Sequence, residues 1–179
     1  SVVVSNGVNP AATSNPAALT LSAVVTPAGQ VSYAGGSYTQ NFNSLPASGT
    51  FTLPANGPYA FSDAPVSAAG LGGWSFAKYD GSGTSVLFRV DAGTGTSGSV
   101  YSYGSTNAPD RALGTLSSGS TIPRFGLTLV NSTGLTVTEL TLSYTGEQWR
   151  RGGGVTNVLA FEYGLGAADI NNGSFVAAP

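Results

Sequence analysis

The sequence predicts an all-β protein and, within that class, an antiparallel β-sandwich with a jelly-roll-like strand order. Short runs of Val, Leu, Phe and Tyr recur at intervals of roughly 8–15 residues, with turn residues between them, as in known sandwiches. The 26 glycines and 10 prolines are spread along the chain and do not gather in one linker. No segment of useful length has the apolar period of a helix.

The chain of 179 residues is expected to contain one main domain. Residues 1–37 are assigned to N-terminal strands and an extended segment that a neighbour could receive in exchange, and residues 38–179 to the sandwich. Charged residues make up 8% of the chain, against roughly 25% in an ordinary globular domain. This low charge, with abundant Ser, Thr, Gly and Asn, favours a secreted, extracellular protein of the cell surface. A start at Ser1 without Met agrees with removal of a signal peptide.

The charge and the missing residue types exclude several classes of function. A formal net charge of −2 argues against a nucleic-acid partner, because neutralising phosphates needs clustered Lys and Arg. No apolar run approaches the ~20 residues of a membrane span, so no transmembrane segment is expected. The chain has neither Cys nor His, which excludes thiol nucleophiles, Ser-His-Asp triads and the common zinc sites.

The expected strands follow from local pattern. Val2, Val3 and Val4 form a β-branched run that the hairpin dipeptide Asn6-Gly7 closes. Two Asn-Pro pairs then keep the chain out of helix, and residues 19–25 alternate as a strand does. The later strands are expected at residues 38–46, 51–54, 59–61, 74–79, 86–90, 100–104, 125–130, 135–144 and 155–163, with 125–130 and 135–144 paired as a hairpin.

Residues 136–151 are expected to form the middle of the sandwich. Leu140, Leu142 and Tyr144 fall on one face of an extended chain. The apolar residues before them have the opposite parity, so a β-bulge near residues 138–139 is expected to turn both sets inward.

No catalytic residue is predicted. None of the carboxylates forms an i, i+2 pair on one strand, which leaves a cross-strand pair of Glu147 and Glu162 as the remaining candidate for acid–base chemistry. Glycines 152–154 lack the lysine and the helix of a phosphate-binding loop. No metal site or cofactor is predicted; calcium at Asp80, Asp91 or Asp110 stays an alternative, since the spacing fits no calcium motif.

Trp149, flanked by Glu147 and Arg151, has two interpretations. As a binding site, the indole is a stacking platform and the two charged groups hydrogen-bond sugar hydroxyls. As a structural feature, the indole is packed and a Glu–Arg pair satisfies a partly buried charge. Core packing is favoured. The same two interpretations apply to the other candidates for ligand binding, Trp74, Tyr101 and Tyr103.

The N-terminal run Val2, Val3 and Val4 also has two interpretations. It can pair within its own sheet, or it can add a strand to the open edge of a neighbouring molecule. The second interpretation predicts self-association by strand exchange.

Five segments together resemble a known module: residues 38–46, 73–74, 101–104, 111–114 and 143–150, the last containing Tyr-Thr-Gly-Glu-Gln-Trp-Arg. The chain resembles, over residues 38–166, a β-sandwich module of secreted bacterial surface proteins that is found beside nuclease or lamin-tail modules or sorting signals. The resemblance implies no catalytic residues. The module has further strands after residues 161–163, and residues 1–37 have no counterpart in it.

These observations lead to an expected function. The first expectation is a non-enzymatic extracellular structural or adhesive protein that self-assembles by β-strand exchange into filaments. The alternative is a carbohydrate-binding module that uses exposed Trp and Tyr, with a glycan as its partner. The third is an accessory domain of a secreted hydrolase or nuclease.

Overall fold

The computed structural model describes residues 3–4, 12–13, 29–152 and 158–178, and these residues form β-strands and no helix. The predicted all-β class is therefore confirmed. Within the same residues, no helix is long and apolar enough to cross a membrane. The strands are β1 (Val3–Val4), β2 (Ala12–Thr13), β3 (Val31–Tyr33), β4 (Thr50–Leu53), β5 (Tyr59–Ala60), β6 (Trp74–Asp80), β7 (Val86–Asp91), β8 (Ser99–Tyr103), β9 (Ala112–Leu116), β10 (Ile122–Leu127), β11 (Leu129–Asn131), β12 (Glu162–Tyr163) and β13 (Val176–Ala177).

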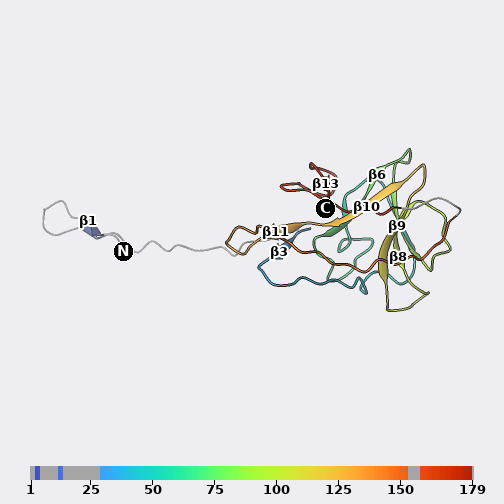
Figure 1. Ribbon diagram of the computed structural model, residues 1–179, viewed down its shortest axis with the longest axis horizontal. Helices are drawn as coiled ribbons and strands as arrows, with labels where there is room; N and C mark the ends of the chain where they lie inside the picture. The colour runs from blue at the N-terminus through green and yellow to red at the C-terminus, as the bar shows by residue number, and fades with distance from the viewer. Residues whose placement is uncertain (1–2, 5–11, 14–28, 153–157, 179) are drawn as a thin grey trace.

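Two sheets make up the body of the protein (Figure 1). The larger has the order β4-β7-β8-β9 and the smaller the order β10-β6-β5, and three further pairs are β1-β2, β3-β11 and β12-β13. Two pairings, β7–β8 and β3–β11, are parallel, so the expectation of purely antiparallel sheets is wrong there. Because β7 and β8 run in the same direction, residues 92–98 carry the chain from the end of β7 back to the level of its start. A two-residue hairpin loop joins only antiparallel strands. The jelly-roll-like order stays a prediction.

One apolar core joins the two larger sheets. Phe76 on β6 and Phe88 on β7 are fully buried, with ring centroids 5.6 Å apart. Phe61, which follows β5, contacts both rings at 4.7 and 5.7 Å. The other members of this buried cluster are Leu45, Leu53, Val66, Ala68, Leu71, Val86 and Val100. Their burial from water supplies the main favourable free energy of folding.

Gly73 lets the β3–β11 pair join the smaller sheet. Its φ of +82° is a conformation that L side chains rarely adopt, and an added Cβ would lie 2.7 Å from the Val31 nitrogen. Thr128, between β10 and β11, donates to the Gly73 carbonyl at 2.9 Å and accepts from the Val31 amide at 2.8 Å. A glycine at residue 73 is thus required by the close approach of β3.

The expected strand at residues 135–144 does not form. Residues 136–152 pair with no described strand, and the expected hairpin with residues 125–130 is also wrong, because β10 pairs with β6 and β11 with β3. No bulge occurs near residues 138–139; the ladder irregularity lies at Ile122/Pro123, where proline cannot donate a hydrogen bond. An alternating pattern indicates that a segment can form a β-strand, but it does not determine which strand pairs with it.

Two other expected strands need correction. Residues 38–46 form no strand and contain a turn at residues 43–44, and the Gln40 and Asn41 side chains accept hydrogen bonds from the backbone amides two residues later. Of residues 155–163, the described part contains only the short strand β12, paired with β13. The expected strand at residues 19–25 lies outside the described residues.

Candidate functional site

The predicted tyrosine pair lies on the face of β8 that points away from the core. Val100 belongs to the core, so Tyr101 and Tyr103 project to the opposite side of the sheet. Their rings stack with centroids 4.8 Å apart and an interplanar angle of 11°. Gly114 on β9 gives Tyr103 its space, because a Cβ there would lie 2.7 Å from the ring. Tyr101 donates to the Ser97 carbonyl at 2.7 Å.

Trp149 extends this stack. Its indole lies almost parallel to the Tyr103 ring, with centroids 6.1 Å apart and an angle of 5°. The indole Nε1 donates to Glu147 Oε2 at 2.8 Å. We call Tyr101, Tyr103 and Trp149 the aromatic stack. The structure therefore brings together four residues that the sequence singled out, including Glu147.

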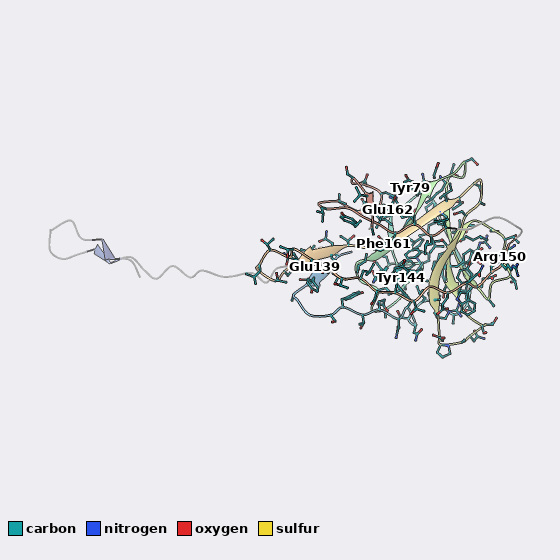
Figure 2. The ribbon with its side chains drawn as sticks, in the orientation of Figure 1. Tyr79, Glu139, Tyr144, Arg150, Phe161 and Glu162 are labelled. Atoms are coloured by element: carbon teal, nitrogen blue, oxygen red, sulfur yellow. The ribbon has the colours of Figure 1, made fainter. Side chains whose placement is uncertain are left out.

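Arg150, and not Arg151, fixes the chain beside the aromatic stack. Arg150 Nη1 donates to the carbonyl oxygens of Thr94 and Gly95, and Figure 2 places Arg150 at one end of the molecule. Arg151 is exposed and makes no hydrogen bond with another described residue. The expected pair of Glu147 with Arg151 is wrong, since Glu147 accepts from the indole instead.

Asp91 holds the loop that Arg150 contacts. Its Oδ1 accepts hydrogen bonds from the amides of Gly93, Thr94 and Gly95 at 2.6, 2.6 and 3.0 Å. Burial raises the pKa of Asp91, but these backbone hydrogen bonds outweigh burial and leave it below its usual value. The sequence offered Asp91 as a candidate calcium ligand, whereas the structure uses this oxygen for the loop.

Burial determines the acid–base behaviour of the aromatic stack. It raises the pKa of Tyr103 to about 12, with smaller contributions from Tyr101 and Asp91 and an opposing one from Arg150. Burial also raises the pKa of Tyr101. Tyr101 is 1% exposed and Tyr103 is 7% exposed. Neither ring presents a face on which a sugar can stack, and Trp149 is half-buried.

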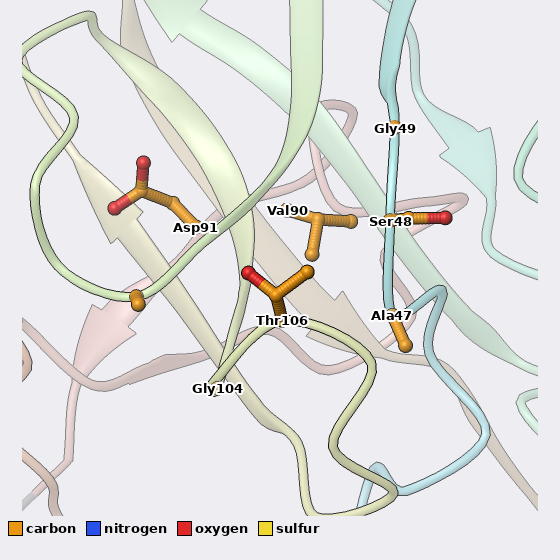
Figure 3. Close-up of a pocket in the computed structure, with 8 residues that line it drawn as sticks. Ala47, Ser48, Gly49, Val90, Asp91, Gly104 and Thr106 are labelled. Carbon is orange, nitrogen blue, oxygen red and sulfur yellow. The ribbon is translucent and has the colours of Figure 1, made fainter.

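A pocket of about 180 Å³ lies beside Asp91 (Figure 3). Ser48, Val90 and Thr106 line it together with the Asp91 end of β7. Its side-chain polar groups are the two hydroxyls and a carboxylate already bonded to the loop. Among the described residues, no group of three or more His, Cys, Asp or Glu is placed to hold a metal ion.

Trp74 lies in a different place from the aromatic stack. Its Nε1 donates to the Tyr38 hydroxyl at 2.8 Å, and its ring meets Phe42 edge-on at 4.8 Å. Phe42 and Trp74 both pack against the core. The candidate carboxylates Glu147 and Glu162 also have separate partners, because Glu162 accepts from Arg124 at 3.1 Å.

Sequence reasoning missed two arginine sites. Arg111 is 3% exposed and donates to the Ser102 hydroxyl, the Ser102 carbonyl and the Ser105 carbonyl at 2.8, 2.5 and 2.9 Å. Arg124 lies 4.0 Å from the centroid of the Tyr79 ring and donates to the Ile170 carbonyl at 2.7 Å. The only sequence signal was the scarcity of charge, which makes each remaining arginine a candidate for a structural role.

Five of the exposed large apolar side chains in the described part of the chain fall within residues 135–144, which we call the apolar ribbon. Glu139, Tyr144 and Arg150 lie one after another across the molecule, so the chain is extended here (Figure 2). Tyr144 stacks on Phe161 with centroids 6.3 Å apart. The exposed large side chains of the ribbon are Leu135 (76%), Val137 (40%), Leu140 (57%), Leu142 (54%) and Tyr144 (71%).

Two of the three candidate strand-exchange residues, Val3 and Val4, form β1. Val3 and Val4 pair with Thr13 and Ala12 of β2, and Val2 lies outside the described residues. Figure 1 places β1 apart from the two larger sheets.

Comparison of the chain with models of known families, with curated proteins and with solved structures found no match.

Proposed function

We propose that this chain is a non-enzymatic structural or adhesive protein of an extracellular surface, which self-associates by β-strand exchange. The observation that supports this most directly is the apolar ribbon. Its five large side chains are 40–76% exposed, and its backbone pairs with no described strand. Soluble monomers rarely expose large contiguous apolar patches, which usually mark interaction surfaces. An extended, unpaired backbone specifically favours an added strand as the partner.

The aromatic stack supports a structural role over carbohydrate binding. A glycan platform needs an exposed aromatic face, whereas Tyr101 and Tyr103 are buried and Trp149 is covered by Tyr103 on one side. The indole nitrogen is bonded to Glu147, so the acidic group proposed for sugar hydroxyls already has a partner. Both features favour packing between the strand β8 and the segment that contains Trp149.

The chemistry of the side chains supports a role without catalysis. The chain has neither His nor Cys. Three carboxylates have partners within the protein: Asp91 accepts from loop amides, Asp169 from the Asn171 and Asn172 amides, and Glu162 from Arg124. The extracellular placement rests on composition, which is poor in charge and rich in Ser, Thr, Gly and Asn.

The experiment that tests this proposal compares the intact chain with a chain lacking residues 1–8 by negative-stain electron microscopy. We expect the intact chain to form filaments at high concentration and the shortened chain to form none. The control is the intact chain with Leu165→Ser. Leu165 is 88% exposed and lies outside the ribbon. Filaments of the same abundance from the shortened chain would contradict strand exchange by the N-terminal residues.

A further inference from the structure

The apolar ribbon offers both requirements for strand addition, an unpaired backbone and an apolar face. Residues 136–152 contain no turn or bend, and no backbone–backbone hydrogen bond joins residues 136–149 to another described residue. Leu140, Leu142 and Tyr144 occupy alternate positions, so in an extended chain they share one face. An incoming extended chain can therefore form backbone hydrogen bonds with the ribbon and, at the same time, cover its apolar face.

A second exposed apolar segment lies next to the ribbon. Val158 and Leu159 are 82% and 68% exposed, and Phe161 joins this second segment to the ribbon through its stack on Tyr144. The eight large apolar side chains of the two segments are thus 40–82% exposed. Exposed apolar side chains that gather in this way mark an interaction surface.

The charges at the ribbon disfavour the pairing of one ribbon with another. Glu139 and Glu147 flank the uncharged residues 140–144. If two ribbons paired antiparallel about residue 143, Glu139 of each would face Glu147 of the other, which is destabilising. Residues 1–62 contain no Asp, Glu, Lys or Arg, so the N-terminal part of the chain meets no such repulsion in any register.

The N-terminal strand has a short ladder among the described residues. It consists of two residue pairs, Val3 with Thr13 and Val4 with Ala12. A two-stranded hairpin is at best marginally stable by itself. Little of this described pairing is lost when β1 leaves β2 to join another strand.

We infer that β1 of one molecule adds to the apolar ribbon of a second copy of this chain, alongside Leu140–Tyr144. This inference rests on the proposed function, strand exchange, and identifies the segment that receives the exchanged strand. Donor and acceptor are different parts of the chain, so the contact is head-to-tail and gives an open filament unless its rotation closes a ring. In the filament, each molecule gives β1 to one neighbour and receives β1 from the other.

Cysteine cross-linking tests this contact, because the chain has no native cysteine. One chain carries Val3→Cys and a second chain carries a single cysteine at residue 140, 141, 142, 143 or 144. The mixed pairs are oxidised and separated on non-reducing gels. The same five variants are repeated with Val4→Cys. All ribbon positions are exposed, so the substitutions leave the core intact.

We expect unlike chains to cross-link with alternation along the ribbon. If Val3→Cys links to even positions, Val4→Cys links to odd positions, or the reverse, because neighbouring residues of a strand face opposite sides. Cross-linked dimers from Leu142→Cys alone would overturn the inference in favour of ribbon–ribbon pairing. Filaments that form without any cross-link between unlike chains would show that the ribbon is not the acceptor of β1. The proposed function would then still hold. A chain that neither cross-links nor assembles would overturn both.

Discussion

The Trp149 indole lies parallel to the Tyr103 ring, with centroids 6.1 Å apart and planes 5° apart. Residue 149 belongs to a segment without secondary structure, and Tyr103 is the last residue of β8, an interior strand of the larger sheet. This contact, with the Arg150 hydrogen bonds to Thr94 and Gly95, attaches the end of the extended segment to the body. The apolar ribbon is thus held at a fixed place while its own side chains stay exposed.

The first prediction concerns Trp149. Trp149→Ala removes the stack and its partial burial, so we expect a loss of about 1.5–3 kcal/mol, below the 3–5 kcal/mol of a fully buried aromatic. Trp149→Phe keeps an aromatic ring against Tyr103 and should lose less. Chemical denaturation measures both. An unchanged free energy of unfolding in Trp149→Ala would show that the indole does not hold the segment.

The second prediction concerns pH. The pKa of Tyr103 is raised from 10.0 to about 12 in the folded protein. The folded state then binds more protons than the unfolded state between these values, so the stabilising contribution is complete below pH 10 and is lost as the pH rises toward 12. Tyr103→Phe should weaken this pH dependence. Denaturation midpoints measured from pH 8 to 11.5 check it, and identical slopes for both proteins would count against a raised pKa.

The third prediction concerns the buried guanidinium. Arg111→Lys keeps the charge but cannot reach the three oxygen acceptors of Ser102 and Ser105 with one ammonium group. We expect a loss of about 2–4 kcal/mol, because buried acceptors are left unpaired. The matched control is Arg151→Lys at an exposed position, which should change stability by less than about 0.5 kcal/mol. Equal effects of the two substitutions would contradict the structural role of Arg111.

The sequence predicted more of the fold than of the site. Alternation located β6, β7 and β8, and the i, i+2 spacing of Tyr101 and Tyr103 predicted that they share a face. The stack on Trp149 was not predictable, because it joins residues far apart in the chain. Local spacing also favoured Arg151 where the structure uses Arg150, since a segment outside any strand does not keep strand parity.

The pattern at residues 135–144 shows a different limit. Alternating Leu and Tyr indicate a strand that is half-buried, and the structure leaves the same residues exposed and paired with no strand of the described chain. Periodicity describes which side chains share a face, but it does not say which molecule covers that face. The mismatch between pattern and structure is what motivates a partner strand from a second copy.

The fourth prediction concerns the apolar ribbon itself. Leu142→Asp places a charge at the centre of the exposed face, and charge on an edge blocks strand pairing. We expect assembly to be lost while the free energy of unfolding changes little, because Leu142 is 54% exposed. Leu165→Asp, at an exposed apolar residue outside the ribbon, is the control and should assemble normally. Sedimentation velocity compares the two, and equal assembly would exclude the ribbon as the contact.

The most direct test of self-association is the molar mass of the intact chain in solution, measured by static light scattering over a concentration series. Head-to-tail strand exchange predicts a weight-average mass that rises continuously above the 17.8 kDa of one chain as concentration increases. A mass that stays at 17.8 kDa at every concentration would contradict it.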